Sequence, residues 1–146
     1  MTLPPNHGDF NRGLDLFNRA DFFDAHEALE DVWRSVPRDR PSRRHLRLHV
    51  QGMVQLAVAF HHESTGNHVG ARSVLERAMR NLNGADSSFP ELDFDRLRAE
   101  LIPWRKYLDD VESADEKDEK KDEKKLGGRE VRRHTAPALP KIVLRR

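Results

Sequence analysis

The chain has 146 residues, a formal net charge of +1 and no cysteine, which excludes disulfide bonds, thiolate nucleophiles and thiolate metal sites. The first 112 residues hold 15 Lys and Arg against 18 Asp and Glu, whereas the last 34 hold 11 against 7. A mildly acidic body, of the size of one domain, therefore precedes a basic tail.

The sequence also carries signals about location. Its first residues show neither a basic region that leads into an apolar run nor a small-residue cleavage pattern. The most apolar stretch, residues 52–60, is far shorter than the roughly 20 residues that cross a bilayer. We therefore expect a cytoplasmic protein that has no membrane partner.

Apolar residues that recur at steps of three and four predict the first three helices. Asp9 is the expected N-cap of the first helix, and Asp21 is the expected N-cap of a second helix that Pro37 stops. After a polar connection over residues 38–44, apolar residues almost surround the helix of residues 46–60. This third helix should therefore be central and the most buried.

Two further helices follow. Gly66 should stop the third helix, and Asn67 should cap a fourth, which ends near Gly84. Apolar residues over 94–111 then predict a fifth helix, which Pro103 should kink or split.

We thus predict an all-α fold: a compact bundle of about five helices, built from two helical hairpins and a kinked C-terminal helix. The expected boundaries are a flexible N-terminus (1–8), a helical domain (9–112) and a disordered charged tail (113–146). In the tail, mixed charges without apolar partners cannot bury enough surface to offset the entropy of ordering. Its last segment, PALPKIVLRR, fits a docking peptide, a contact with an anionic surface or an untethered terminus.

The second helix carries the main candidates for chemistry. His26 and Glu30 are four residues apart on neighbouring turns, so their side chains can touch. In a structural interpretation, Glu30 accepts a hydrogen bond from the His26 ring and orients it beneath Trp33. In a functional interpretation, Glu30 raises the basicity of His26 for proton transfer, or both residues bind a metal.

His61 and His62, at the end of the central helix, are further metal candidates. They can approach His26 if the second and third helices pack antiparallel, as a short connection favours. The zinc-protease pattern is absent, because Glu30 stands where that pattern needs its second histidine. Phosphate loops, dinucleotide fingerprints and nucleophile elbows are absent too.

A cluster of arginines surrounds the connection between the second and third helices. Its members are Arg34, Arg38, Arg40, Arg43, Arg44 and Arg47. Such a cluster suits phosphate, carboxylate or an RNA backbone, and the alternative is a solvated basic loop. Because the body is acidic, general affinity for nucleic acid is disfavoured, and a small anionic ligand or an acidic partner fits better.

The segments LFNRADFFDAHEALEDVWR and QGMVQLAVAFHHESTGNHVGARSVLERAMRNL resemble the domain of unknown function 309 family. The likeness runs from about Phe10 to Leu82. It implies a compact all-helical bundle without an established activity. The positions that it marks are His26, Glu27, Glu30, Trp33, Gln51, Gln55, His61, Gly66, Asn67 and Gly70.

The leading hypothesis is a helical domain that binds a ligand or a protein partner. Its candidate binding residues are Glu27, Trp33, Gln51, Gln55, His61 and Asn67. One alternative is a metal-dependent enzyme that uses His26 and Glu30 with His61 or His62. Another is an anion or RNA binder that uses the arginines and the basic tail. The sequence assigns no cofactor and leaves a homo-oligomer open.

Overall fold

The computed structural model describes the backbone of residues 7–121 and 135–146, and the side chains of residues 8–114 and 135–146. In this part of the chain the structure is all-helical, with one isolated β-bridge and no strand. The α-helices are α1 (His7–Asn18), α2 (Phe22–Ser35), α3 (Arg44–Ser64), α4 (His68–Asn81) and α5 (Phe94–Lys121). Two short 3-10 helices, η1 (Pro41–Arg43) and η2 (Ala85–Ser87), lie before α3 and before α5. The predicted all-α fold with five helices is confirmed.

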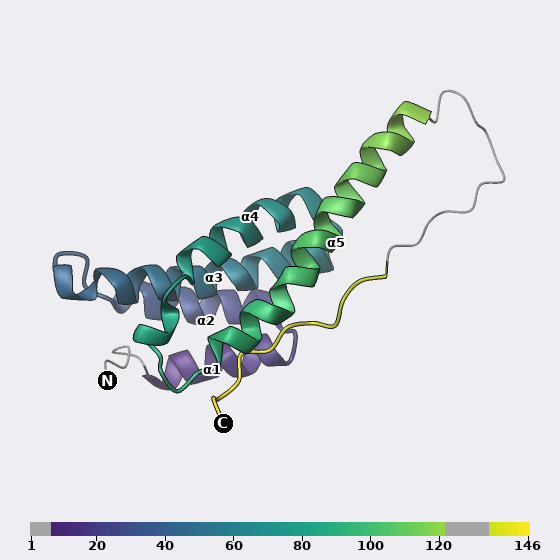
Figure 1. Ribbon diagram of the computed structural model, residues 1–146. Helices are drawn as coiled ribbons and strands as arrows, with labels where there is room; N and C mark the ends of the chain where they lie inside the picture. The colour runs from purple at the N-terminus through teal and green to yellow at the C-terminus, as the bar shows by residue number, and fades with distance from the viewer. Residues whose placement is uncertain (1–6, 122–134) are drawn as a thin grey trace.

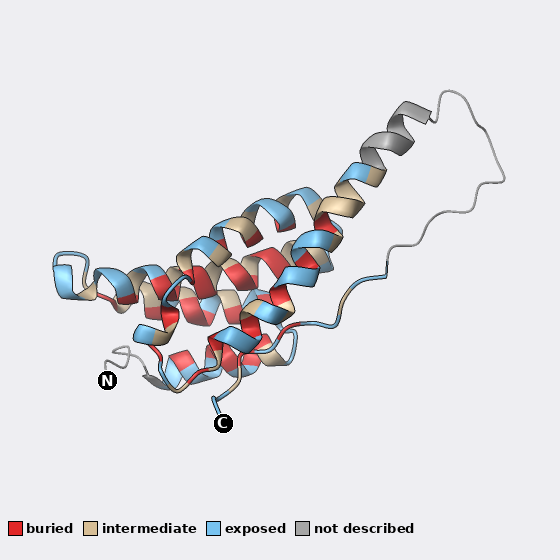
Figure 2. Ribbon diagram, viewed as in Figure 1, coloured by how far each residue is buried: buried red, intermediate tan, exposed pale blue. Residues whose placement is uncertain are grey.

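Consecutive helices pack against one another. The helices α1 to α4 lie in chain order, so that α3 has α2 on one side and α4 on the other, and α5 crosses them and contacts α4 (Figure 1). The buried residues lie mainly on the sides of the helices that face one another (Figure 2). The predicted central position of α3 is confirmed, because nine of its residues, among them Val50, Met53 and Leu56, are buried.

The helix ends agree only in part with the predicted caps. Gly66, which follows the C-cap residue of α3, adopts φ +83°, and the Asn67 side chain accepts a hydrogen bond from the Gly70 N–H at 3.0 Å at the start of α4. Asp21 precedes α2, but its side chain makes no capping hydrogen bond. The helix α1 begins at His7, so Asp9 lies in its first turn rather than at the cap. There its carboxylate still favours the helix N-terminus electrostatically.

The helix α5 is not split at Pro103 but continues to Lys121. Pro103 lacks the N–H that would bond to the carbonyl of Ala99, and both residues are exposed. The sequence beyond residue 112 alternates Glu and Lys at spacings that support a helix. No described helix has an apolar run long enough to cross a membrane.

Residues 135–146 return along α5 and pack against the body (Figure 1). The Trp104 Nε1–H donates to the carbonyl of Ala138 at 2.9 Å, and Ile142 is only 3% exposed. Over residues 135–146 the structure thus differs from the expectation of an unpacked tail. The physical reason is that Ile142 finds an apolar contact surface while the main chain around it finds hydrogen-bond partners. The prediction for residues 122–134 lies outside the described residues.

Candidate functional site

The predicted contact between His26 and Glu30 is present at the surface of α2. His26 Nε2 lies 2.9 Å from Glu30 Oε2, and the two side chains are 28% and 29% exposed. Glu30 uses its other oxygen to accept a hydrogen bond from Arg34 at 2.7 Å. The pair therefore lies at the rim of the bundle rather than in its core, and Glu30 is shared between His26 and Arg34.

Phe23 lies between the histidines of α2 and α3. Its ring centre is 6.1 Å from that of His26 and 5.5 Å from that of His61, and the residue is 51% exposed. His61 in turn lies 6.4 Å from His62, between ring centres. Among the described side chains no three His, Asp or Glu residues form a group that could hold a metal ion. Of the four metal candidates, His26 and Glu30 are thus in contact, but neither His61 nor His62 joins them in a group of three.

Several residues marked by the family resemblance form the turn between α3 and α4. Asn67 caps α4 through its side-chain oxygen, and its Nδ2 lies 3.3 Å from His62 Nδ1. A Cβ at Gly70 would lie 2.5 Å from Asn67 Nδ2, so Gly70 leaves room for the cap. Gly66 supplies the positive φ that the turn needs. These residues have a structural role that explains their types.

The remaining candidates have separate positions. Gln55 accepts a hydrogen bond from Asn81 Nδ2 at 2.8 Å, which ties α3 to α4. Glu27 is exposed on α2. Gln51 lines a pocket at the other end of α3, where Trp33 also lies close by.

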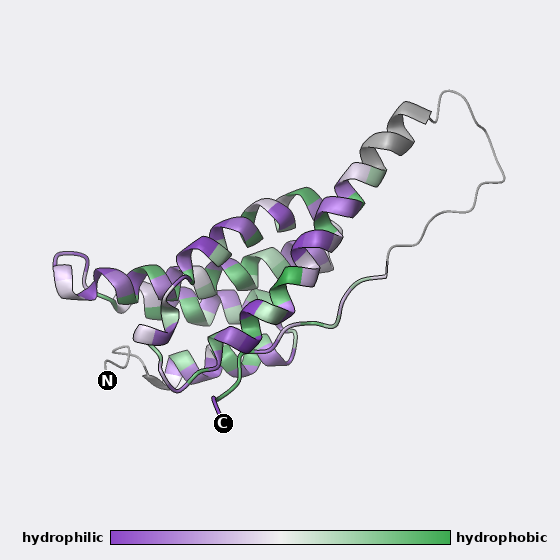
Figure 3. Ribbon diagram, in the orientation of Figure 1, coloured by the Kyte–Doolittle hydropathy of each residue, from purple (hydrophilic) through white to green (hydrophobic). Residues whose placement is uncertain are grey.

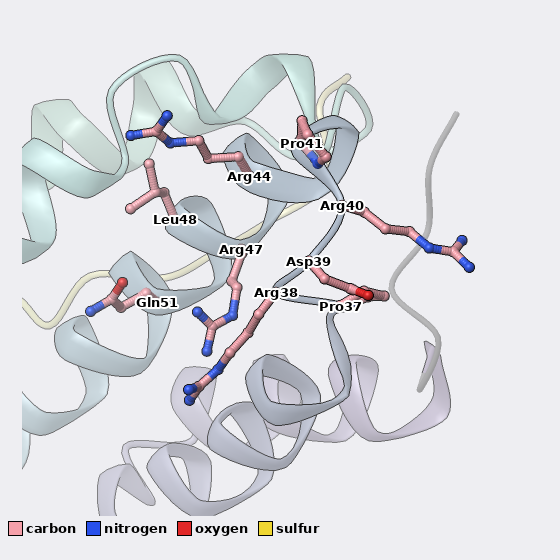
Figure 4. Close-up of a pocket in the computed structure, with 9 residues that line it drawn as sticks. All are labelled: Pro37, Arg38, Asp39, Arg40, Pro41, Arg44, Arg47, Leu48 and Gln51. Atoms are coloured by element: carbon pink, nitrogen blue, oxygen red, sulfur yellow. The ribbon is translucent and has the colours of Figure 1, made fainter.

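This pocket is formed by the connection between α2 and α3 and by the first turns of α3 (Figure 4). It is an open pocket of about 450 Å³ lined by Pro37, Arg38, Asp39, Arg40, Pro41, Arg44, Arg47, Leu48 and Gln51. Four of the nine residues are arginines and only Asp39 is acidic. The connection is also markedly hydrophilic (Figure 3). We call this cavity the arginine pocket.

Trp33 brings two of the arginines together. The guanidinium carbon of Arg47 lies 4.1 Å from the centre of the Trp33 ring, and that of Arg38 lies 5.7 Å from it. Both distances allow cation–π attraction. Desolvation, and then the nearby positive charge of Arg38, lower the pKa of Arg47 from its ordinary value. Two like charges thus share one aromatic ring.

Several nitrogen donors at this end of α3 have no hydrogen-bond partner among the described residues. They are Nε and Nη2 of Arg47, Nη1 of Arg43 and Nε1 of Trp33, and all four atoms are buried. An unsatisfied buried donor costs about 1–3 kcal/mol. These unpaired donors therefore carry a cost of this size beside the arginine pocket.

The sequence correctly located the arginine cluster at the connection between α2 and α3, but it did not identify all of the residues that meet there. Arg34 belongs instead to the His26 and Glu30 surface, where it pairs with Glu30. Trp33 was expected to lie near His26, whereas its ring packs with Arg38 and Arg47. The stacking partner was missed because Trp33 and Arg47 lie on different helices. The available signal was the antiparallel packing of α2 and α3, which brings the end of one to the start of the other.

Comparisons with known proteins cover the same part of the chain. Residues 10–74 match the family model described as Domain of unknown function (DUF309). The chain is 32% identical over 78 residues to the uncharacterized protein YpuF of Bacillus subtilis (strain 168), an alignment that covers 53% of this chain and 42% of the relative. It is 26% identical over 85 residues to an uncharacterized protein of Aquifex aeolicus (strain VF5), covering 58% and 24%.

The chain thus spans less than half the length of these two curated relatives. No solved structure matches it. The matched residues contain α2, α3 and all nine residues that line the arginine pocket. Residues 10–74 of this chain are therefore similar to the domain of unknown function family DUF309.

Proposed function

We propose that this protein is a ligand-binding domain whose arginine pocket takes a small anion of the phosphate class. The observation that carries the proposal is the position of Arg38 and Arg47 over the ring of Trp33. Neither guanidinium has an ion pair with a carboxylate among the described residues. An anion bound between Arg38 and Arg47 would offset the repulsion between the two guanidinium groups, because it attracts both of them.

The chemistry of the donors supports phosphate. Guanidinium groups bind phosphate oxygens through paired, charge-assisted hydrogen bonds. The pocket presents Arg40 and Arg44 beside Arg38 and Arg47, so donors are available for more than one oxygen. The buried, unpaired Nε and Nη2 of Arg47 would gain acceptors.

The size of the pocket supports a small ligand. Its volume of about 450 Å³ lies in the usual range for small-molecule sites, roughly 300–1,000 Å³. Leu48, Pro37 and Pro41 provide apolar surface beside the arginines, and Gln51 provides an amide. A ligand that joins a phosphate to an organic group could therefore contact the arginines with its phosphate and the apolar side chains with its organic group.

The first experiment is calorimetric titration with pyrophosphate. We expect saturable binding that Arg47→Gln weakens by about tenfold or more, since a hydrogen bond to a charged group contributes about 1.5–3 kcal/mol. The matched control is Arg77→Gln, which removes an exposed arginine of α4 that does not line the pocket. Equal losses in both variants would show nonspecific attraction and would contradict the proposal.

Tryptophan fluorescence gives an independent readout. The chain has two tryptophans, and Trp104 is only 2% exposed. Ligand binding at the arginine pocket should change the emission of Trp33 and leave that of Trp104 unchanged. The fluorescence change should therefore be absent from a Trp33→Phe variant. A change that persists in this variant would place the ligand elsewhere.

The other two hypotheses become outcomes of the same work. An RNA backbone in place of a small ligand would give a much steeper loss of affinity with salt, because each phosphate contact releases counterions. The metal-dependent enzyme hypothesis keeps His26 and Glu30 as candidates, although Glu30 already binds Arg34. Stoichiometric metal in the purified protein that is lost in folded His26→Ala would favour that enzyme. A cytoplasmic location is part of our proposal, and the cysteine-free sequence is compatible with it.

A further inference from the structure

The C-terminal segment, residues 135–146, lies away from the connection between α2 and α3, which lines the arginine pocket (Figure 1). Asn18, at the end of α1, bonds to both main-chain groups of Ile142: its Nδ2 donates to the Ile142 carbonyl at 2.8 Å, and the Ile142 N–H donates to its Oδ1 at 2.8 Å. A side-chain amide used in this way replaces the neighbouring strand that an extended peptide would pair with. The Ile142 side chain is 3% exposed and acts as the apolar anchor.

The loop before α5 pairs with the same segment. The Asp93 N–H donates to the carbonyl of Val143 at 2.9 Å, and the Arg145 N–H donates to the carbonyl of Glu91 at 2.7 Å. Between these bonds, Leu92 and Leu144 form an isolated antiparallel bridge. The segment is thus bound by β-strand addition over a short length.

Two side chains of α5 complete the contact. The Trp104 Nε1–H donates to the carbonyl of Ala138 at 2.9 Å, and Glu100 Oε2 accepts from the Lys141 N–H at 3.1 Å. Every one of these hydrogen bonds involves a main-chain N–H or carbonyl group of the segment. We call the surface that makes them the docking groove. It consists of Asn18, Glu91, Leu92, Asp93, Glu100 and Trp104.

Charge complementarity adds to the fit. The docking groove carries three acidic residues, Glu91, Asp93 and Glu100, whereas the segment carries Lys141, Arg145 and Arg146. Glu91 Oε2 is buried and has no hydrogen-bond partner among the described residues. This oxygen stays unpaired although the basic segment is in place, so the complementarity lies in the overall charge of the two surfaces and not in an ion pair with Glu91.

We propose that the docking groove is a peptide-binding site that also accepts the C-terminal segment of a second copy of this chain. A second copy carries the same anchor, the same basic residues and the same main chain, so the exchange needs no new type of contact. Residues 122–134 alone connect the segment to α5, and the end of α5 projects away from the body (Figure 1).

The linker of residues 122–134 determines whether the docking groove binds the segment of its own chain or that of a second copy. A segment joined by a short linker has an effective concentration on the order of millimolar at its own groove. The wild-type chain should therefore occupy its own groove at lower protein concentrations. Binding of the segment from a second copy should become measurable when the chain's own segment can no longer bind to the groove.

Two complementary full-length variants test this. Ile142→Asp disables the segment and leaves the docking groove intact, whereas Asn18→Ala weakens the groove and leaves the segment intact. We expect neither variant to dimerise alone in sedimentation velocity, and the equimolar mixture to form a heterodimer at least about tenfold more readily. A mixture that stays monomeric up to about 1 mM, the scale of the effective concentration, would overturn the proposal.

A labelled peptide of residues 135–146 provides the second readout. It should bind full-length Ile142→Asp and should not bind Leu144→Asp, which makes the same chemical change at a side chain that is 68% exposed. Circular dichroism verifies that each variant is folded, and Ile142→Ala replaces Ile142→Asp if the latter is not. Equal peptide binding by the Ile142 and Leu144 variants would contradict a site anchored by Ile142. Peptide binding without heterodimer formation would overturn the exchange between copies.

Discussion

The ring of His49 is held by Ser88 in the interior of the protein, where His49 Nδ1 lies 2.6 Å from Ser88 Oγ. Its other nitrogen, Nε2, lies 3.2 Å from the carbonyl oxygen of Asn83. Because a carbonyl only accepts, Nε2 carries the hydrogen, and Nδ1 accepts from the Ser88 hydroxyl. The neutral ring is thus fully satisfied, and it joins α3 to the segment that follows α4.

This arrangement predicts a loss of stability in acid. Desolvation lowers the pKa of His49, with a smaller contribution from His45, while the Asn83 carbonyl and Asp86 oppose the shift. The folded protein therefore binds the proton less well than the unfolded chain, whose ordinary pKa is 6.5. The stabilisation is complete above this value and is lost as the pH falls through the lower folded pKa. Urea unfolding of wild type and His49→Gln from pH 7.5 to 5 measures this loss of stability. If the free energy of unfolding falls equally steeply with pH in both proteins, the prediction is contradicted.

Gly52→Ala should destabilise the contact between α3 and α4. A Cβ at residue 52 would lie 2.9 Å from Leu82 Cγ and 3.2 Å from the backbone carbon of Asn81. The backbone cannot move aside easily, so we expect a loss of about 1–3 kcal/mol in the free energy of unfolding. Gly8→Ala in α1 is the matched control, since its Cβ would meet nothing within 4 Å. Similar losses in both variants would mean that the clash is not the cause.

Asn67→Ala should destabilise the start of α4. The variant loses the side-chain oxygen that accepts from the Gly70 N–H, at an expected cost of about 0.5–2 kcal/mol. Asn67→Asp retains this oxygen and should retain most of the stability. Thermal unfolding checks both variants. If Asp is as damaging as Ala, the contact of Asn67 with His62 matters more than the cap.

Glu30→Gln should have only a small effect on folding. The carboxylate bonds to His26 and Arg34, but the side chains of these three residues are 29%, 28% and 64% exposed, and exposed ion pairs contribute about 0–1 kcal/mol. Chemical denaturation of the variant measures this difference. A loss well above 1 kcal/mol would show that the pair supports the bundle. A small loss of stability allows the variant to be used as a folded probe of function.

The sequence by itself determined the helices and two of their ends. Apolar residues at steps of three and four located all five helices, and Gly66 with Asn67 located the turn between α3 and α4. It also brought the arginines to one connection and placed His26 within reach of Glu30. These features depend on residues a few positions apart, whose hydrogen bonds and side-chain spacing are fixed by helix geometry alone.

Only the tertiary structure decided which distant residues meet. The packing of α2 on α3 brought Trp33 to Arg47 and placed Phe23 between His26 and His61. The same holds for Ile142, which lies 124 positions from its partner Asn18. Mixed charges without apolar partners predicted an unpacked tail there, because composition records local preference alone. A contact across such a separation depends on whether the folded surface offers an apolar anchor site and hydrogen-bond partners together.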